Sequence, residues 1–288
     1  MQRPVLGYIK NKEIVGVRNL SQEDFAEYKK ASSELEKYML SGQLFSITLL
    51  NHDDFVETIR SYLEALSTDQ DIGKHNLDRF VLNLNRKILN YLCSARTFLD
   101  HNETELKRSF GKSEVEFFKT ICSEHFDNSF AYRFLYKLRN YAQHCGMPVG
   151  NFIIESEKDP TSETGKRVTV SLLFDRDKLL KRFDRWGAPL KKEISEMHPY
   201  FDVAPLLEEM MYRLGDIHLS LIRKLFPNIQ AEALLIKQMA SEVGEEHGRV
   251  IIFDFKDRSE GNAQLVFKDL PLQEAYWVLE DIKKVNAQ

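Results

Sequence analysis

The stretch LDRFVLNLNRKILNYLCSARTFL, residues 77–99, decides the fold class of this chain. Its apolar residues recur at steps of three and four, the spacing that places side chains on one face of an α-helix. This apolar stripe consists of Leu77, Val81, Leu84, Ile88, Leu92, Ala95 and Leu99. The sequence therefore predicts a long amphipathic helix that buries one face against other helices.

The polar residues of this predicted helix form a second stripe on the opposite face. It consists of Arg79, Asn83, Arg86, Asn90, Ser94, Thr97 and His101. Residues 79–99 and 129–154 contain no aspartate or glutamate, although the whole chain has 44 acidic and 40 basic residues. Two acid-free basic segments predict a local positive field that suits phosphate groups. The net charge of −4 speaks against a protein that coats nucleic acid over its whole surface.

Capping residues and helical spacing predict further helices on both sides. They cover residues 21–40, 53–66, 113–125, 129–145, 177–185, 189–197, 203–225, 230–242 and the segment after Pro271. Ser129 is the expected N-cap of its helix, which Gly146 and Pro148 should end. His52, Asp53 and Asp54 are expected to cap the helix over 53–66 and not to bind a metal ion.

Short β-rich runs predict small antiparallel hairpins. They involve residues 4–18 with a turn at Asn11-Lys12, residues 151–155 with 167–174, and residues 249–255 with 263–267. The predicted fold class is mainly α, α+β overall: a helical bundle with small antiparallel β-hairpin appendages in the C-terminal half. We expect a helical bundle with a short N-terminal extended segment over residues 1–150, and a mixed hairpin and helix region of unknown role over 151–288.

The cysteines and the missing motifs exclude several classes of protein. Cys93, Cys122 and Cys145 are odd in number and lack paired spacing, so neither a disulfide framework nor a zinc site is indicated. The common nucleotide-binding, hydrolase and zinc-protease motifs are absent. No apolar run approaches the ~20 residues that span a bilayer, and the N-terminus shows no signal-peptide pattern. We expect a cytoplasmic protein without cofactor, metal or membrane contact.

The helix over 129–145 carries the segment Arg139-Asn140-Tyr141-Ala142-Gln143-His144. Its core face is predicted to hold Phe134, Leu138, Tyr141, Ala142 and Cys145. A second, basic stripe consists of Arg133, Lys137, Asn140 and His144. Arg139 lies on the other flank of the core face, about 140° around the helix from His144. The two side chains need a partner helix or a second chain to meet.

This segment resembles the R-x4-6-H signature of the HEPN superfamily, and the resemblance covers roughly residues 20–150. It implies a helical bundle and a metal-independent endoribonuclease, in which the RNA 2′-hydroxyl attacks the adjacent phosphate and leaves a 2′,3′-cyclic phosphate. It implies His144 as the acid–base residue, Arg139 as the phosphate clamp, and Asn140 as the residue that orients the imidazole or the phosphate. It also implies a homodimer that assembles the site, and a toxin or phage-defence role with an antitoxin or regulatory protein as a further partner.

Additional RNA contacts are expected from Arg133, Lys137, Arg86, Asn90 and His101. Each position also has a simpler interpretation. The cations can be a solvated helix face, His144 can interact with the C-terminal end of a helix dipole, and His101 can cap its own helix. The alternative function is a catalytically silent HEPN-like module that binds RNA, a nucleotide or a partner protein.

Overall fold

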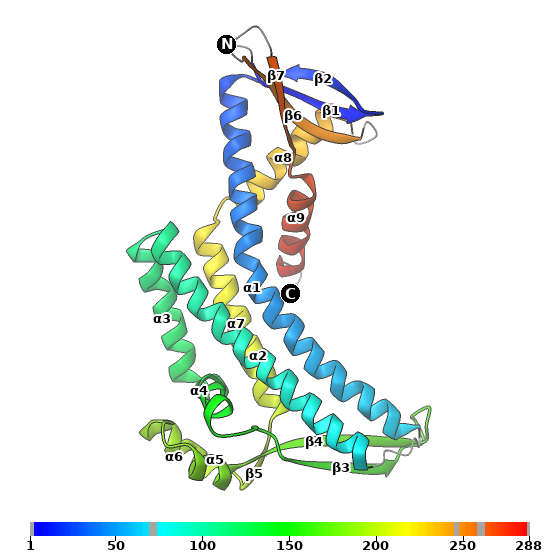
Figure 1. Ribbon diagram of the computed structural model, residues 1–288, viewed down its shortest axis with the longest axis vertical. Coiled ribbons are helices and arrows are strands. Elements are labelled where there is room, and N and C mark those ends of the chain that lie inside the picture. Colours follow the sequence, from blue (N-terminus) through cyan, green and yellow to red (C-terminus); the bar gives the residue numbers. More distant parts are fainter. Residues whose placement is uncertain (1–2, 69–73, 245–247, 258–262, 287–288) are drawn as a thin grey trace. The chain divides into compact units, whose positions relative to one another are not determined.

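The computed structural model describes residues 3–68, 74–244, 248–257 and 263–286 (Figure 1). Its helices are α1 (Gln22–Ser67), α2 (Lys74–Ser109), α3 (Lys112–Asn128), α4 (Phe130–His144), α5 (Arg176–Arg182), α6 (Ala188–Glu196), α7 (Ala204–Leu225), α8 (Ile229–Val243) and α9 (Leu272–Asn286). Its strands are β1 (Val5–Lys10), β2 (Glu13–Asn19), β3 (Asn151–Lys158), β4 (Lys166–Asp175), β5 (Tyr200–Asp202), β6 (Arg249–Asp257) and β7 (Ala263–Asp269). The predicted class, mainly α with small antiparallel sheets, is confirmed.

The chain forms two compact units. One combines Met1–Gly42 with Ile222–Gln288, and the other is Gln43–Leu221. This division differs from the predicted boundary at residue 150. Residues 151–221 belong to the same unit as α2, α3 and α4, because their aromatic side chains form part of the core on which α4 packs.

The first unit joins the two ends of the chain in one sheet. Its strand order is β2-β1-β6-β7 (Figure 1). Val5 of β1 lies opposite Phe253 of β6. The predicted turn at Asn11 and Lys12 is confirmed, since both residues have positive φ, 50° and 68°, as a two-residue hairpin turn requires. The three predicted hairpins are present as the pairs β1–β2, β3–β4 and β6–β7, and the N-terminal one joins a four-stranded sheet through β1 in place of forming an isolated extended segment.

One face of this sheet carries the core of the first unit. Leu6 and Ile252, paired across β1 and β6, pack in one apolar cluster with Leu35 of α1 and Ile236 of α8. Gly7 lies where a Cβ would meet the Val15 carbonyl oxygen at 2.1 Å, so only glycine fits between the two strands. The alternating apolar residues of the strands thus find their partners on helices from both ends of the chain.

A single helix, α1, replaces the two helices predicted over 21–40 and 53–66. The predicted break was wrong because no proline interrupts residues 41–52 and the polar side chains bond back to the helix. Thr48 donates to the Leu44 carbonyl at 2.8 Å, and Asn51 donates to the Ile47 carbonyl at 3.0 Å. His52, Asp53 and Asp54 therefore lie inside a helix and do not cap one.

The helix predicted from residues 77–99 is confirmed as α2, and it runs on to Ser109. His101 therefore lies two turns before the end of its helix, which makes its interpretation as a cap wrong. The apolar stripe is buried as expected, with Leu84, Ile88 and Ala95 fully covered. The opposite stripe stays at the surface, where Arg86, Asn90 and His101 are exposed.

His218 of α7 is a buried histidine of the second unit. Its ring stacks on Phe45, with centroids 4.4 Å apart, and meets the edge of Phe98. Burial lowers the pKa of His218 from 6.5 to about 4. The folded protein therefore keeps this ring neutral at pH values where the unfolded chain protonates it.

The folding stability is expected to depend on this proton. Stability should be complete above about pH 6.5 and should fall as the pH drops toward 4, with a loss of ~2 kcal/mol at pH 5 relative to pH 7.5. His218→Phe keeps the stacking and removes the proton, so it should lose less over the same interval. Urea unfolding of both proteins at the two pH values measures the difference, and an equal loss in both would contradict the assignment.

Candidate functional site

The candidate site lies on α4, whose start is fixed by hydrogen bonds. The predicted N-cap is confirmed, because the Ser129 hydroxyl oxygen accepts a hydrogen bond from the Tyr132 backbone N–H at 3.1 Å. The same hydroxyl donates to Glu209 Oε1 of α7 at 2.6 Å. In the helix before it, His125 Nε2 lies 3.1 Å from Asp216 Oδ2, also of α7. The polar start of α4 is thus tied to a neighbouring helix.

An aromatic cluster fixes the other face of α4. Phe134 stacks on Trp186 at 5.6 Å and meets the edges of Phe174 and Phe201. Two turns further along, the Tyr141 ring lies 6.1 Å from the ring of Trp186, which is itself buried and donates from Nε1 to a backbone carbonyl. Aromatic pairs of this kind add stability beyond their buried area. Aromatic residues from the region after residue 150 therefore fix the orientation of α4.

The side chains of Arg139, Asn140 and His144 have no hydrogen-bond or ion-pair partner in the described part of the chain. Arg139 and Asn140 are half-buried, and His144 is exposed at the last residue of α4. The Arg139 Nε is buried without an acceptor, which is costly unless another molecule supplies one. Helical geometry separates Arg139 and His144 by about 140° and ~7.5 Å along the axis. One α4 helix alone does not bring them together.

Arg133 is fully engaged within the fold. It bonds Glu193 of α6 through Nη2 at 2.5 Å and Nε at 3.3 Å. Its Nη1 also donates to the Phe126 and Asp127 carbonyls at the end of α3, at 2.5 and 2.7 Å. These bonds compensate its charge and cap a neighbouring helix, so Arg133 has a structural role within the fold, and the RNA contact expected from its stripe stays a prediction.

The other predicted RNA contacts remain at the surface. Lys137 is half-buried on α4 and lies on the same stripe of the helix as His144, two turns before it. On α2, Arg86 donates to the Asn83 side-chain oxygen at 2.7 and 3.1 Å, which holds its planar group, and it forms no ion pair with any residue that the structure describes. Asn90 and His101 lie further along the same exposed face. The expected basic surface of α2 is therefore accessible.

Asn85 is a residue that sequence reasoning missed. Its side chain, only 3% exposed, donates to the Val149 carbonyl at 2.8 Å and accepts from the Val149 N–H at 3.0 Å. This pair of bonds fixes the segment that follows His144 onto α2. Its position in the sequence could have indicated its burial, because Asn85 lies four residues after Val81, at the border of the apolar stripe.

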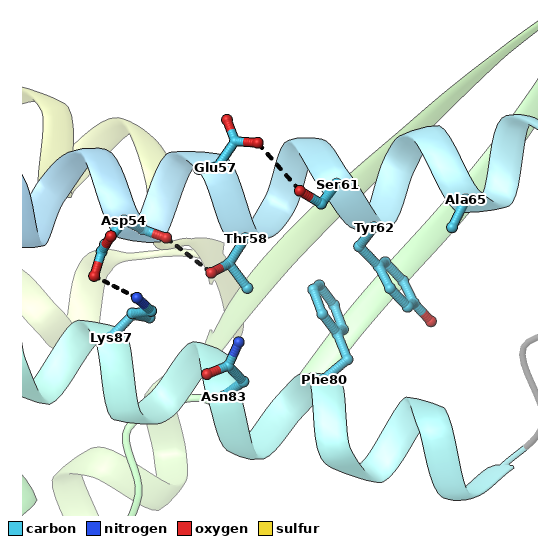
Figure 2. A pocket seen from close by; sticks show the side chains of 9 residues that line it. All are labelled: Asp54, Glu57, Thr58, Ser61, Tyr62, Ala65, Phe80, Asn83 and Lys87. Carbon is cyan, nitrogen blue, oxygen red and sulfur yellow. Dashed lines mark hydrogen bonds and ion pairs between the residues drawn. The ribbon is translucent and has the colours of Figure 1, made fainter.

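A hollow of about 410 Å³ lies elsewhere in the same unit, between α1 and α2 (Figure 2). Tyr62 and Phe80 face each other there, with ring centroids 3.6 Å apart. Lys87 bonds Asp54 across its rim, so these two charges already satisfy each other. No motif residue lines this hollow, and we treat it as separate from the site on α4.

Other classes of site have little support. Within the described ranges, no group of three or more histidine, cysteine or acidic side chains is placed to hold a metal ion. The three cysteines are free, and burial raises the pKa of the Cys122 thiol to about 12, which makes it a poor nucleophile. No helix of the described residues has the length and apolar character needed to cross a lipid bilayer.

Comparison with protein-family models, curated proteins and solved structures finds no match to this chain.

Proposed function

We propose that this chain is a metal-independent endoribonuclease of the HEPN type that acts as a homodimer. The main observation behind the proposal is a set of polar side chains without partners at the end of α4. Arg139, Asn140 and His144 are presented by a helix that packing holds in place, yet their side chains have no partner within the described residues. Fixed polar groups without internal partners are suited to a substrate.

The proposed reaction needs only a proton carrier and a cation. His144 accepts the proton of an RNA 2′-hydroxyl and returns it to the departing 5′-oxygen. The bond from the 2′-oxygen to phosphorus forms as the bond to the 5′-oxygen breaks, which leaves a 2′,3′-cyclic phosphate and a 5′-hydroxyl. Arg139 stabilises the negative charge that develops on the phosphoryl oxygens. Asn140 orients the imidazole or the phosphate.

The side chains of Arg139 and His144 point to different sides of α4, which supports a site shared by two copies. If α4 of one copy faces α4 of another, the arginine of each can meet the histidine of its partner. Lys137, Arg86, Asn90 and His101 would extend the contact with the RNA backbone. We propose that the enzyme acts in the cytoplasm as a toxin or phage-defence effector, under the control of an antitoxin or regulatory protein.

Mixing two inactive variants tests the shared site. Arg139→Ala and His144→Ala are each expected to be inactive, but mixed dimers contain one site in which both residues are intact. An equal mixture after exchange of subunits should recover about a quarter of the wild-type rate, because half of the dimers are mixed and each has one active site. Cleavage of a synthetic RNA in EDTA measures the recovery.

The remaining outcomes separate the alternatives. An active wild type with an inactive mixture would place Arg139 and His144 in the same chain. A wild type that binds RNA without cutting it would favour the silent binding module. Size measurements of the mixture, with a tag of known mass on one variant, confirm that dimers are present and that subunits have exchanged.

A further inference from the structure

Two cations of α5 lie against the segment that directly follows His144. Lys178 and Arg182 are four residues apart, so they share one face of this short helix. Arg182 Nη1 donates to the Cys145 carbonyl at 3.4 Å. A Cβ added at Gly146 would lie 3.2 Å from the same nitrogen, and one added at Gly150 would lie 3.5 Å from Lys178 Nζ. The Arg182 head group therefore reaches the end of α4, and the Lys178 head group lies beside Gly150, further along the segment that leaves this helix.

The charges of these two residues are not compensated. Among the described residues, neither Lys178 nor Arg182 forms an ion pair, and Arg182 is exposed. The acids beside them have other partners: Asp177 pairs with Arg176 at 2.8 Å, and Asp175 accepts from the backbone N–H of Lys178 at 2.9 Å as the N-cap of α5. The positive charge at this point is available to an anion.

The position of Arg182 matches the side of α4 that carries His144. Tyr141 and His144 are three residues apart and therefore neighbours on the helix surface. Burial raises the pKa of Tyr141, while the positive charge of Arg182 acts against that rise, as expected of a guanidinium close to the phenol. Arg139, two residues before Tyr141, points about 160° away from it.

We propose that Arg182 and Lys178 form a phosphate-binding site beside His144 within one chain. This inference rests on the proposed function, in which His144 acts on an RNA phosphate. An anion at the C-terminus of a helix faces the negative end of the helix dipole, so a site there needs cations of its own. Arg182 and Lys178 supply them, while Arg139 approaches from the second copy.

Binding of inorganic phosphate tests the inference without any cleavage. The probe is the ring chemical shift of His144 in protein labelled at histidine, assigned by its absence in His144→Ala. Phosphate should shift this signal saturably in the wild type. Arg182→Gln should weaken the affinity about tenfold or more, because a bond to a charged group is lost. Lys178→Gln should have a smaller effect.

Two matched variants sharpen the result. Arg185→Gln removes an exposed arginine three residues further along and should leave the affinity unchanged. Arg182→Lys keeps the charge and should retain most of the binding, which shows that a loss in Arg182→Gln does not come from unfolding. Unchanged affinity in Arg182→Gln, or no saturable shift in the wild type, would overturn the inference. A protein that binds phosphate through Arg182 but cuts no RNA would refute the proposed function alone.

Discussion

His144→Ala is expected to lower the rate of RNA cleavage about 10²–10⁴-fold, the range that one positioned acid–base group contributes. The side chain is exposed at the last residue of α4 and has no partner in the described part of the chain, so its removal should leave the fold intact. The measurement is the initial rate of cleavage of a synthetic single-stranded RNA in EDTA, with thermal unfolding of the variant as the check on folding.

Gln143→Ala is the matched control for this variant. Gln143 is the preceding residue, is equally at the surface and belongs to the same helical turn, but it lies outside the proposed chemistry. Its replacement should change the rate by less than about twofold. Equal activity of wild type, control and His144→Ala would point to a contaminating nuclease and would contradict a catalytic role for His144.

Asn85→Leu is expected to destabilise the protein by about 2–5 kcal/mol. Leucine has a similar size but offers no polar group, so the backbone N–H and carbonyl of Val149 would remain buried without partners. Val149 is only 2% exposed, and each unsatisfied buried group costs about 1–3 kcal/mol. The free energy of unfolding in urea measures the loss.

Asn83→Leu provides the comparison on the same helix. Asn83 is two residues away and half-buried, and among the described residues its side-chain oxygen accepts hydrogen bonds from Arg86 alone, at the surface. Its replacement should cost less than about 1 kcal/mol. Comparable losses in both variants would show that the two bonds to Val149 contribute little to stability.

Helix starts and tight turns could be predicted because each depends on the residue types at one or two neighbouring positions. Ser129 marks the start of α4, and Asn11 and Lys12 mark a tight turn, each through the conformation of one or two residues. The pairing of β1 with β6 was not predictable in this way. It joins Val5 to Phe253 through backbone hydrogen bonds, which leave no trace in the spacing of nearby residues. The break predicted in α1 failed because Thr48 and Asn51 bond within the helix.

The site was predictable only in part, for a similar reason. Helical spacing alone places Arg139 and His144 on different sides of α4. It does not show that Arg133 is neutralised, because its partner Glu193 comes 60 residues later on another helix. Nor does it show Arg182, which reaches the Cys145 carbonyl from α5. Which cations are free for a substrate depends on tertiary contacts.

The most direct test of the central claim is the chemistry of the RNA ends that the wild-type protein produces in EDTA. We predict metal-independent cleavage of a single-stranded RNA into fragments that carry a 2′,3′-cyclic phosphate and a 5′-hydroxyl. Mass spectrometry of the fragments distinguishes these ends from a 3′-hydroxyl and a 5′-phosphate. Cleavage that stops in EDTA, or fragments with 5′-phosphate ends, would contradict the mechanism assigned to Arg139 and His144.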